Sequence, residues 1–159
     1  MIEEKLAALG LSLPQPAEPA FDYVPVTIHC RTAYVSGQLP KVDGEVRCRG
    51  KVGAEVSAED AAEAARICIL QGLACLKATL GNLDRVARVL KVTGFVASAP
   101  GFNRQPQVID AASRLLIDVF GETGRHARSA IGVAELPRNA PVEIEMIVAI
   151  KDHSEDRHA

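Results

Sequence analysis

An arginine and two glutamates in the last third of the chain have the types and spacing that could support chemistry. Arg128 lies in the run 127–136, and Glu143 and Glu145 lie in the run 142–150. A guanidinium binds a planar carboxylate through two parallel hydrogen bonds, and a carboxylate can orient a water molecule or transfer a proton. The alternative is a structural ion pair between Arg128 and one of the glutamates.

Two strands are expected to position these side chains, because their residues alternate between two faces. The side chains that share a face with Arg128, beginning at Ala130, are very small. Glu143 and Glu145 share a face opposite an apolar row, so the sequence leaves open which of them faces a site. The link 137–141 contains two prolines, and we expect the two strands to pair as an antiparallel hairpin.

A second informative segment lies near the start of the chain. Tyr23 is followed by the run Ser36-Gly37-Gln38-Leu39-Pro40, which ends a predicted strand. A glycine here allows the backbone to approach a ligand or a neighbouring chain closely, and the alternative is an ordinary turn glycine.

Together these segments resemble the RidA/YjgF family of imine and enamine deaminases. The resemblance rests on matches in colinear order at residues 23–24, 34–40, 127–129, 131, 134, 136–137 and 142–145. It implies hydrolysis of 2-imino acids, such as 2-aminoacrylate, to 2-keto acids and ammonium without a metal or cofactor. It also implies a chorismate-mutase-like fold assembled as a homotrimer, with pockets between subunits that take a small carboxylate substrate.

The resemblance assigns roles residue by residue. Arg128 would bind the substrate carboxylate and Glu143 would orient the attacking water, and these two are the expected catalytic residues. The expected substrate-binding residues are Tyr23, Ser36, Gly37, Ala130 and Arg128.

The sequence departs from the family pattern near this site. His126 replaces a common proline, Ala130 stands where cysteine is frequent, and Asp110 stands where many members have asparagine. Gly132 and Glu135 replace larger or basic residues, and the N-terminus is longer than in compact members. Two other classes of function therefore stay open: a non-catalytic module that binds a small carboxylate metabolite, and an endoribonuclease.

Composition and charge narrow the class of protein. The 159 residues suit one globular domain, and a net charge of −2 with no tryptophan argues against nucleic acid as a partner. The four cysteines lack CxxC or zinc-ligand spacing, so we expect neither a disulfide nor a metal. The chain has no signal-like N-terminus and no apolar run that could cross a membrane, which predicts a cytoplasmic protein.

The order of elements predicts an α+β fold. Helices are expected at 2–9, 58–80 and 102–120, and strands at 24–28, 33–36 and 85–98, before the two strands of the candidate site. The two main helices would form a single layer on one face of a mixed, largely antiparallel sheet. The other face, expected to carry Arg128 and the carboxylates, would need cover by association. The expected organisation is an N-terminal helix and proline-rich connector at 1–20, the main domain at 21–151 and a charged tail at 152–159.

Overall fold

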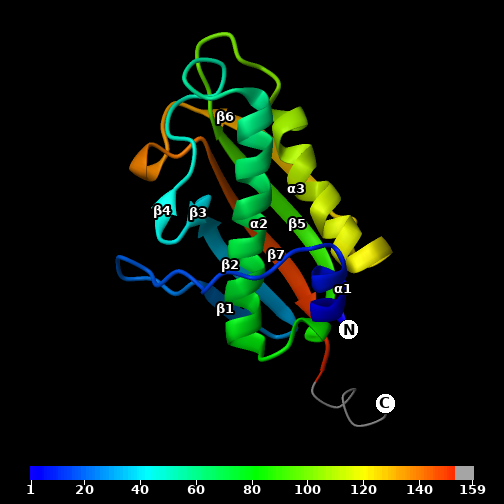
Figure 1. Ribbon diagram of the computed structural model, residues 1–159. Helices are drawn as coiled ribbons and strands as arrows, with labels where there is room; N and C mark the ends of the chain where they lie inside the picture. Colours follow the sequence, from blue (N-terminus) through cyan, green and yellow to red (C-terminus); the bar gives the residue numbers. More distant parts are fainter. Residues whose placement is uncertain (153–159) are drawn as a thin grey trace.

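Five strands form one sheet in the computed structural model, which describes residues 1–152 (Figure 1). Their order across the sheet is β1-β2-β7-β5-β6, and every pair is antiparallel except β5 with β6. The bounds are β1 (Val26–His29), β2 (Thr32–Gln38), β5 (Val86–Ala97), β6 (Ala127–Val133) and β7 (Val142–Ile150). A separate hairpin pairs β3 (Lys41–Val42) with β4 (Glu45–Val46).

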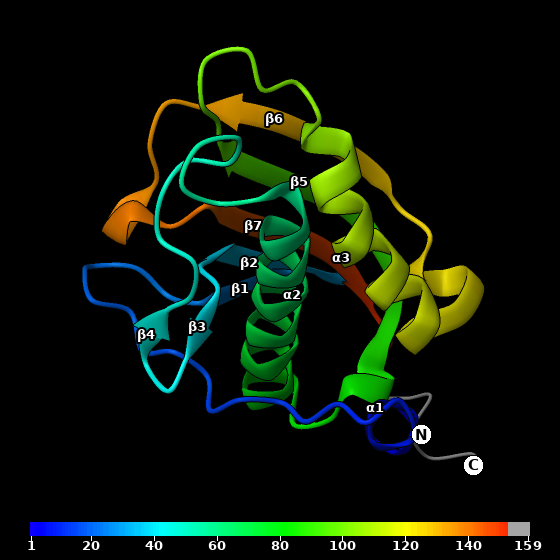
Figure 2. The ribbon, with the colours of Figure 1, turned by 45° about the horizontal axis from the view of Figure 1, so that its top comes forward.

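Two helices, α2 (Ala58–Leu80) and α3 (Gln105–Phe120), lie side by side on one face of the sheet (Figure 2). The α2 helix begins where the Ser57 hydroxyl accepts a hydrogen bond from the Asp60 backbone at 3.0 Å, and it ends at Gly81. Figure 2 shows no helix of the described chain on the opposite face. The predicted α+β fold, with a single layer of two main helices on a mixed, largely antiparallel sheet, is confirmed.

The core lies between the sheet and the helix layer. Every second residue of β7, from Val142 to Ile150, is buried against the helices. Gly72 of α2 lies so close to Met146 that a Cβ at this position would stand 2.5 Å from the Met146 Cε. The small residue therefore lets the helix rest directly on the strand.

The N-terminal segment crosses the helix layer. The α1 helix (Ile2–Ala8) buries Leu6 in the core, and the Ile2 backbone N–H donates to the Asp84 carboxylate at 2.9 Å. The connector that follows passes over α2 toward β1 (Figure 1). The predicted domain boundary at residue 20 stays a prediction, and all but the first residue of the predicted tail lies outside the described residues.

The predicted hairpin between the last two strands is wrong, because β6 and β7 are not neighbours. The strand β5 lies between them, parallel to β6 and antiparallel to β7. With 12 residues β5 is long enough to pair along both neighbours, so an interior place between β7 and β6 satisfies more of its backbone hydrogen bonds than an edge would. The link from β6 to β7 crosses one strand, roughly 10 Å, which eight residues span easily. It contains the short helix η3 (Pro137–Asn139).

Further expectations concern cysteines and membranes. Cys68 and Cys75 are buried in α2, Cys30 and Cys48 are exposed, and all four are free thiols. Among the described residues, no helix combines the length and apolar character needed to cross a membrane.

Candidate functional site

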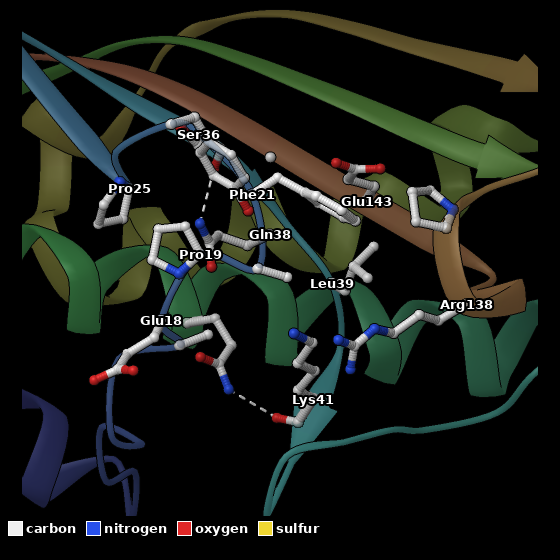
Figure 3. Close-up of a pocket in the computed structure, with 16 residues that line it drawn as sticks. Glu18, Pro19, Phe21, Pro25, Ser36, Gln38, Leu39, Lys41, Arg138 and Glu143 are labelled. Atoms are coloured by element: carbon white, nitrogen blue, oxygen red, sulfur yellow. Dashed lines mark hydrogen bonds between the residues drawn. The ribbon is translucent and has the colours of Figure 1, made fainter.

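A cavity of about 540 Å³ lies where the N-terminal connector, the end of β2 and the start of β7 meet (Figure 3). Tyr23, Ser36, Gly37 and Glu143, four of the predicted site residues, all line it. The structure therefore brings together residues that are more than 100 positions apart in the sequence.

Glu143 supplies the carboxylate of this cavity. Its side chain is half-buried, and burial, followed by the negative charge of Glu145, raises its pKa above the ordinary value for a glutamate. No lysine or arginine among the described residues forms an ion pair with it. Glu145 is exposed on the same face of the sheet but does not line the cavity. The geometry thus selects Glu143 as the carboxylate that can act there.

Gly37 lies directly against this carboxylate. A Cβ built at position 37 would overlap the Glu143 side chain, and the backbone of Gly37 does not have a positive φ. The glycine is therefore explained by the approach of Glu143 and not by a turn, an explanation that neither sequence interpretation included.

A Gly37→Ala variant is expected to displace the Glu143 carboxylate. Because the overlapped atoms end a flexible side chain that can move aside, the loss of stability should be near the low end of the overpacking range, about 1 kcal/mol. A displacement of the carboxylate near 1 Å costs about 100-fold in a rate that depends on the group. Thermal unfolding and steady-state kinetics measure the two effects. The loss of stability should largely disappear when Gly37→Ala is combined with Glu143→Ala, which leaves room for the methyl group. An equal loss in both backgrounds would contradict this account.

An irregularity in β2 directs its last residues toward the cavity. The pairing of β2 with β7 shifts register between Val35 and Gln38. The Ser36 hydroxyl donates to the Val24 carbonyl at 2.7 Å, and the Gln38 amide donates to the Ser36 carbonyl at 2.9 Å. Bulges of this kind redirect side chains at the ends of strands.

Five polar residues of the lining were not predicted as site residues: Glu18, Gln38, Lys41, Gln71 and Arg138. Lys41 comes from the start of β3, Arg138 from η3 and Gln71 from α2. Burial, and then the charge of Arg138, lower the pKa of Lys41. Gln71 is 4% exposed on the otherwise apolar face of α2, and a lone amide at such a position is a signal that sequence reasoning could have used.

Arg128 lies away from this cavity. Its side chain extends from β6 toward α3, where its Nη1 atom donates to the Ser113 hydroxyl at 3.2 Å and lies 3.6 Å from the Asp110 carboxylate. The suggested ion pair between Arg128 and Glu143 or Glu145 is therefore wrong, because Asp110 of α3 is the partner.

Arg128 and Glu143 lie on opposite faces of the sheet, so the prediction that one open face carries both is wrong. Arg128 is level with Val92, which is buried under the helices, whereas Glu143 is level with Phe95 on the other face. Two strand spacings and three residues along the strand separate them, which places their Cα atoms roughly 14 Å apart. Ala130 stays on the side of Arg128 and does not line the larger cavity.

A smaller cavity of about 200 Å³ lies beside Arg128. The Ser113 hydroxyl is 2.9 Å from Nε2 of His126, and Nδ1 of His126 is 2.6 Å from the Gly124 carbonyl. Since Nδ1 must donate to that carbonyl, a neutral His126 accepts at Nε2 from Ser113, and Ser113 accepts from Arg128. Burial and the charge of Arg128 lower the pKa of His126, although its hydrogen bond to Gly124 opposes them. The chain of hydrogen bonds holds the guanidinium in place.

The face of the sheet without helices presents apolar side chains, and we call it the open face. Tyr34 and Ile131 are 45% and 46% exposed, and the half-buried Phe95 and Ile147 lie on the strands between them. These apolar side chains share the open face with Lys91, Thr93 and Glu145, and exposed apolar groups on an uncovered sheet face favour association. Among the described residues, no group of histidine, cysteine or carboxylate side chains is arranged to hold a metal ion.

The chain is similar to known proteins in both sequence and structure. Residues 3–149 match a family model described as "YjgF/chorismate mutase-like, putative endoribonuclease". Protein TCP17 of Trypanosoma cruzi is 43% identical over 152 residues, which cover 95% of each chain. A 2-iminobutanoate/2-iminopropanoate deaminase of Dermatophagoides farinae is 33% identical over 139 residues, 87% of this chain and 91% of the relative. A solved structure of a protein with unknown function from Agrobacterium tumefaciens has a TM-score of 0.88 at 48% identity, covering 94% of this chain and 92% of the other.

Proposed function

The chain belongs to the YjgF/chorismate-mutase-like family, and on this premise we propose that it hydrolyses reactive 2-imino acids and their enamine tautomers to 2-keto acids and ammonium. The observation that carries the proposal is the Glu143 carboxylate, which lines a cavity, has a raised pKa and has no ion-pair partner among the described residues. The relative from Dermatophagoides farinae, whose name states an imine deaminase activity, supports the same chemistry.

The reaction requires a water molecule held in position for attack and a group that accepts and donates a proton. A protonated imine carbon is already electrophilic, so the oxygen of a water molecule held by Glu143 adds to it. The carboxylate accepts a proton from that water and returns it to the nitrogen, which becomes an ammonium leaving group. The C–N bond then breaks as the C=O bond forms, while the carboxylate accepts the remaining hydroxyl proton. Ammonia leaves and takes up this proton as ammonium. A carboxyl group with a raised pKa suits both directions of transfer.

We propose that the carboxylate of the substrate is bound by Arg128 of the partner subunit in a homotrimer. Within one chain Arg128 lies on the wrong face to reach the cavity that Glu143 lines. The strand β6 that carries it is an edge strand, and the open face beside it has apolar side chains that association would bury. Both features support a site assembled from two copies of the chain.

Hydrolysis of freshly generated 2-aminoacrylate tests the proposal. We expect the protein to release pyruvate faster than the uncatalysed reaction, with saturation by substrate. A rate equal to the background for this imine and for bulkier 2-imino acids would contradict the deaminase function. Binding of the 2-keto acid without acceleration would instead indicate a non-catalytic binding module, and cleavage of RNA by nuclease-free protein that Glu143→Gln abolishes would indicate a ribonuclease.

A further inference from the structure

Two cationic side chains line the Glu143 cavity without a carboxylate partner. Lys41 and Arg138 come from different segments, and among the described residues neither forms an ion pair. Figure 3 shows their charged ends converging at one end of the cavity, away from Glu143. The positive charge of Arg138 contributes to the lowered pKa of Lys41, in agreement with this proximity. Glu18 also lines the cavity but forms no ion pair with either cation among the described residues. Like charges held together without a direct counterion favour an anion between them.

The backbone around Arg138 is held in an uncommon conformation. Arg138 and Asn139 both have positive φ, 56° and 57°, although neither is glycine. The Ala140 N–H donates to the Pro137 carbonyl at 3.1 Å, and the Gly50 N–H donates to the Asn139 carbonyl at 2.9 Å, so two hydrogen bonds maintain the turn. Consecutive left-handed residues of this type are unfavourable unless the surroundings impose them. The turn fixes the direction in which the Arg138 side chain leaves the backbone.

Lys41 is fixed from the opposite side by Gln71. The Nε2 atom of Gln71 donates to the Lys41 backbone carbonyl at 2.8 Å. The Oε1 atom of the same buried amide has no hydrogen-bond partner among the described residues, although Gln71 lines the cavity. The Nε2 hydrogen bond holds the start of β3, and with it the root of the Lys41 side chain, beside the cavity.

We propose that Lys41 and Arg138 form a subsite for a second carboxylate, so that the preferred substrates are 2-imino acids whose side chain ends in a carboxylate. This inference rests on the proposed function, in which Arg128 of the partner subunit binds the other carboxylate. The cavity of about 540 Å³ in a single chain leaves room for a substrate longer than a three-carbon imino acid. The subsite names a substrate class that the family fold alone does not specify.

Binding of two product analogues of equal chain length tests the subsite without requiring turnover. We expect 2-oxoglutarate to bind the intact protein about tenfold or more tightly than 2-oxopentanoate, because its terminal carboxylate meets the two cations. Combining Lys41→Met with Arg138→Leu should remove this preference by weakening the dicarboxylate alone. Arg47→Leu is the matched control. It removes an exposed arginine that directly follows β4 and does not line the cavity, so the preference for the dicarboxylate should stay intact. Isothermal titration calorimetry measures each affinity.

The outcomes separate the subsite from the deaminase function. Equal affinities of the wild-type protein for the two acids, or no binding of either, would overturn the subsite, and so would a preference that survives in a folded double variant. Imine hydrolysis without a dicarboxylate preference leaves the function standing while the subsite fails. A dicarboxylate preference without imine hydrolysis supports the subsite while the function fails.

Discussion

Replacing Arg128 with alanine is expected to lower kcat/KM for 2-imino acid hydrolysis by about 100-fold or more. Losing one partner of a hydrogen-bonded charge pair costs about 2–5 kcal/mol, and here the partner is the substrate carboxylate. Coupled measurement of 2-keto acid release gives the rate. Arg125→Ala is the matched control, because Arg125 lines the same small cavity but pairs with the exposed Glu122 at 3.0 Å.

Mixed assemblies show whether the site is shared between chains. Arg128→Ala and Glu143→Gln are each expected to be nearly inactive, yet every mixed trimer contains one interface with both native residues. Random mixing by co-refolding in equal amounts should restore roughly a quarter of the wild-type sites. Activity that stays absent in the mixture, with correct assembly of each variant, would contradict a site built from two subunits.

The helices show what sequence periodicity can predict. The bounds expected for α2 were 58–80, and the structure has Ala58–Leu80. Ser57 at one end and Gly81 at the other are local signals, since a helix cap depends on residues a few positions apart. The Asp43-Gly44 turn between β3 and β4 is a local signal of the same kind, and both residues have the positive φ that such a turn requires.

The order of strands in the sheet could not be predicted from local sequence signals. The alternation of side chains correctly assigns residues to the two faces within β6 and within β7. It does not show which face of β6 lies on the same side of the sheet as a given face of β7, because the two strands do not pair. Because β5 lies between them, the relation is set by its register, which aligns Val92 with Arg128 and Phe95 with Glu143. Long-range pairing of this kind depends on packing of the whole chain, so two residues predicted as a pair lie on opposite faces.

The lining of the large cavity was only partly predictable for a similar reason. Tyr23, Ser36 and Gly37 belong to short motifs that a resemblance can transfer. Lys41 and Arg138 come from segments whose charges look like solvated loop residues in the sequence, and only the fold brings them to one cavity. Their roles, like those of the transferred residues, stay predictions for the experiments above.

Replacing Glu143 with glutamine is expected to lower kcat by about 100- to 10,000-fold, the range typical of a lost general base. Glutamine keeps the shape of the side chain but cannot accept a proton from water at neutral pH. The affinity for the 2-keto acid should change little, because its carboxylates are bound elsewhere. Glu145→Gln is the control, since Glu145 does not line the cavity. It should stay active, and an equal loss in both variants would contradict the assignment of Glu143 as the base.

The same substitution is expected to stabilise the folded protein at neutral pH. Because folding raises the pKa of Glu143 above 4.5, the folded state favours the protonated carboxyl, and the wild type loses stability as the pH rises through that raised pKa. Glutamine cannot ionise, so Glu143→Gln should have the higher melting temperature at pH 7 and no advantage near pH 4. Thermal unfolding at both values measures the difference. Glu145→Gln removes a negative charge that raises this pKa, so the acid limb of its activity profile should move to lower pH. A carboxylate that acts as the base would thus be kept at a cost to stability, as expected of a functional residue.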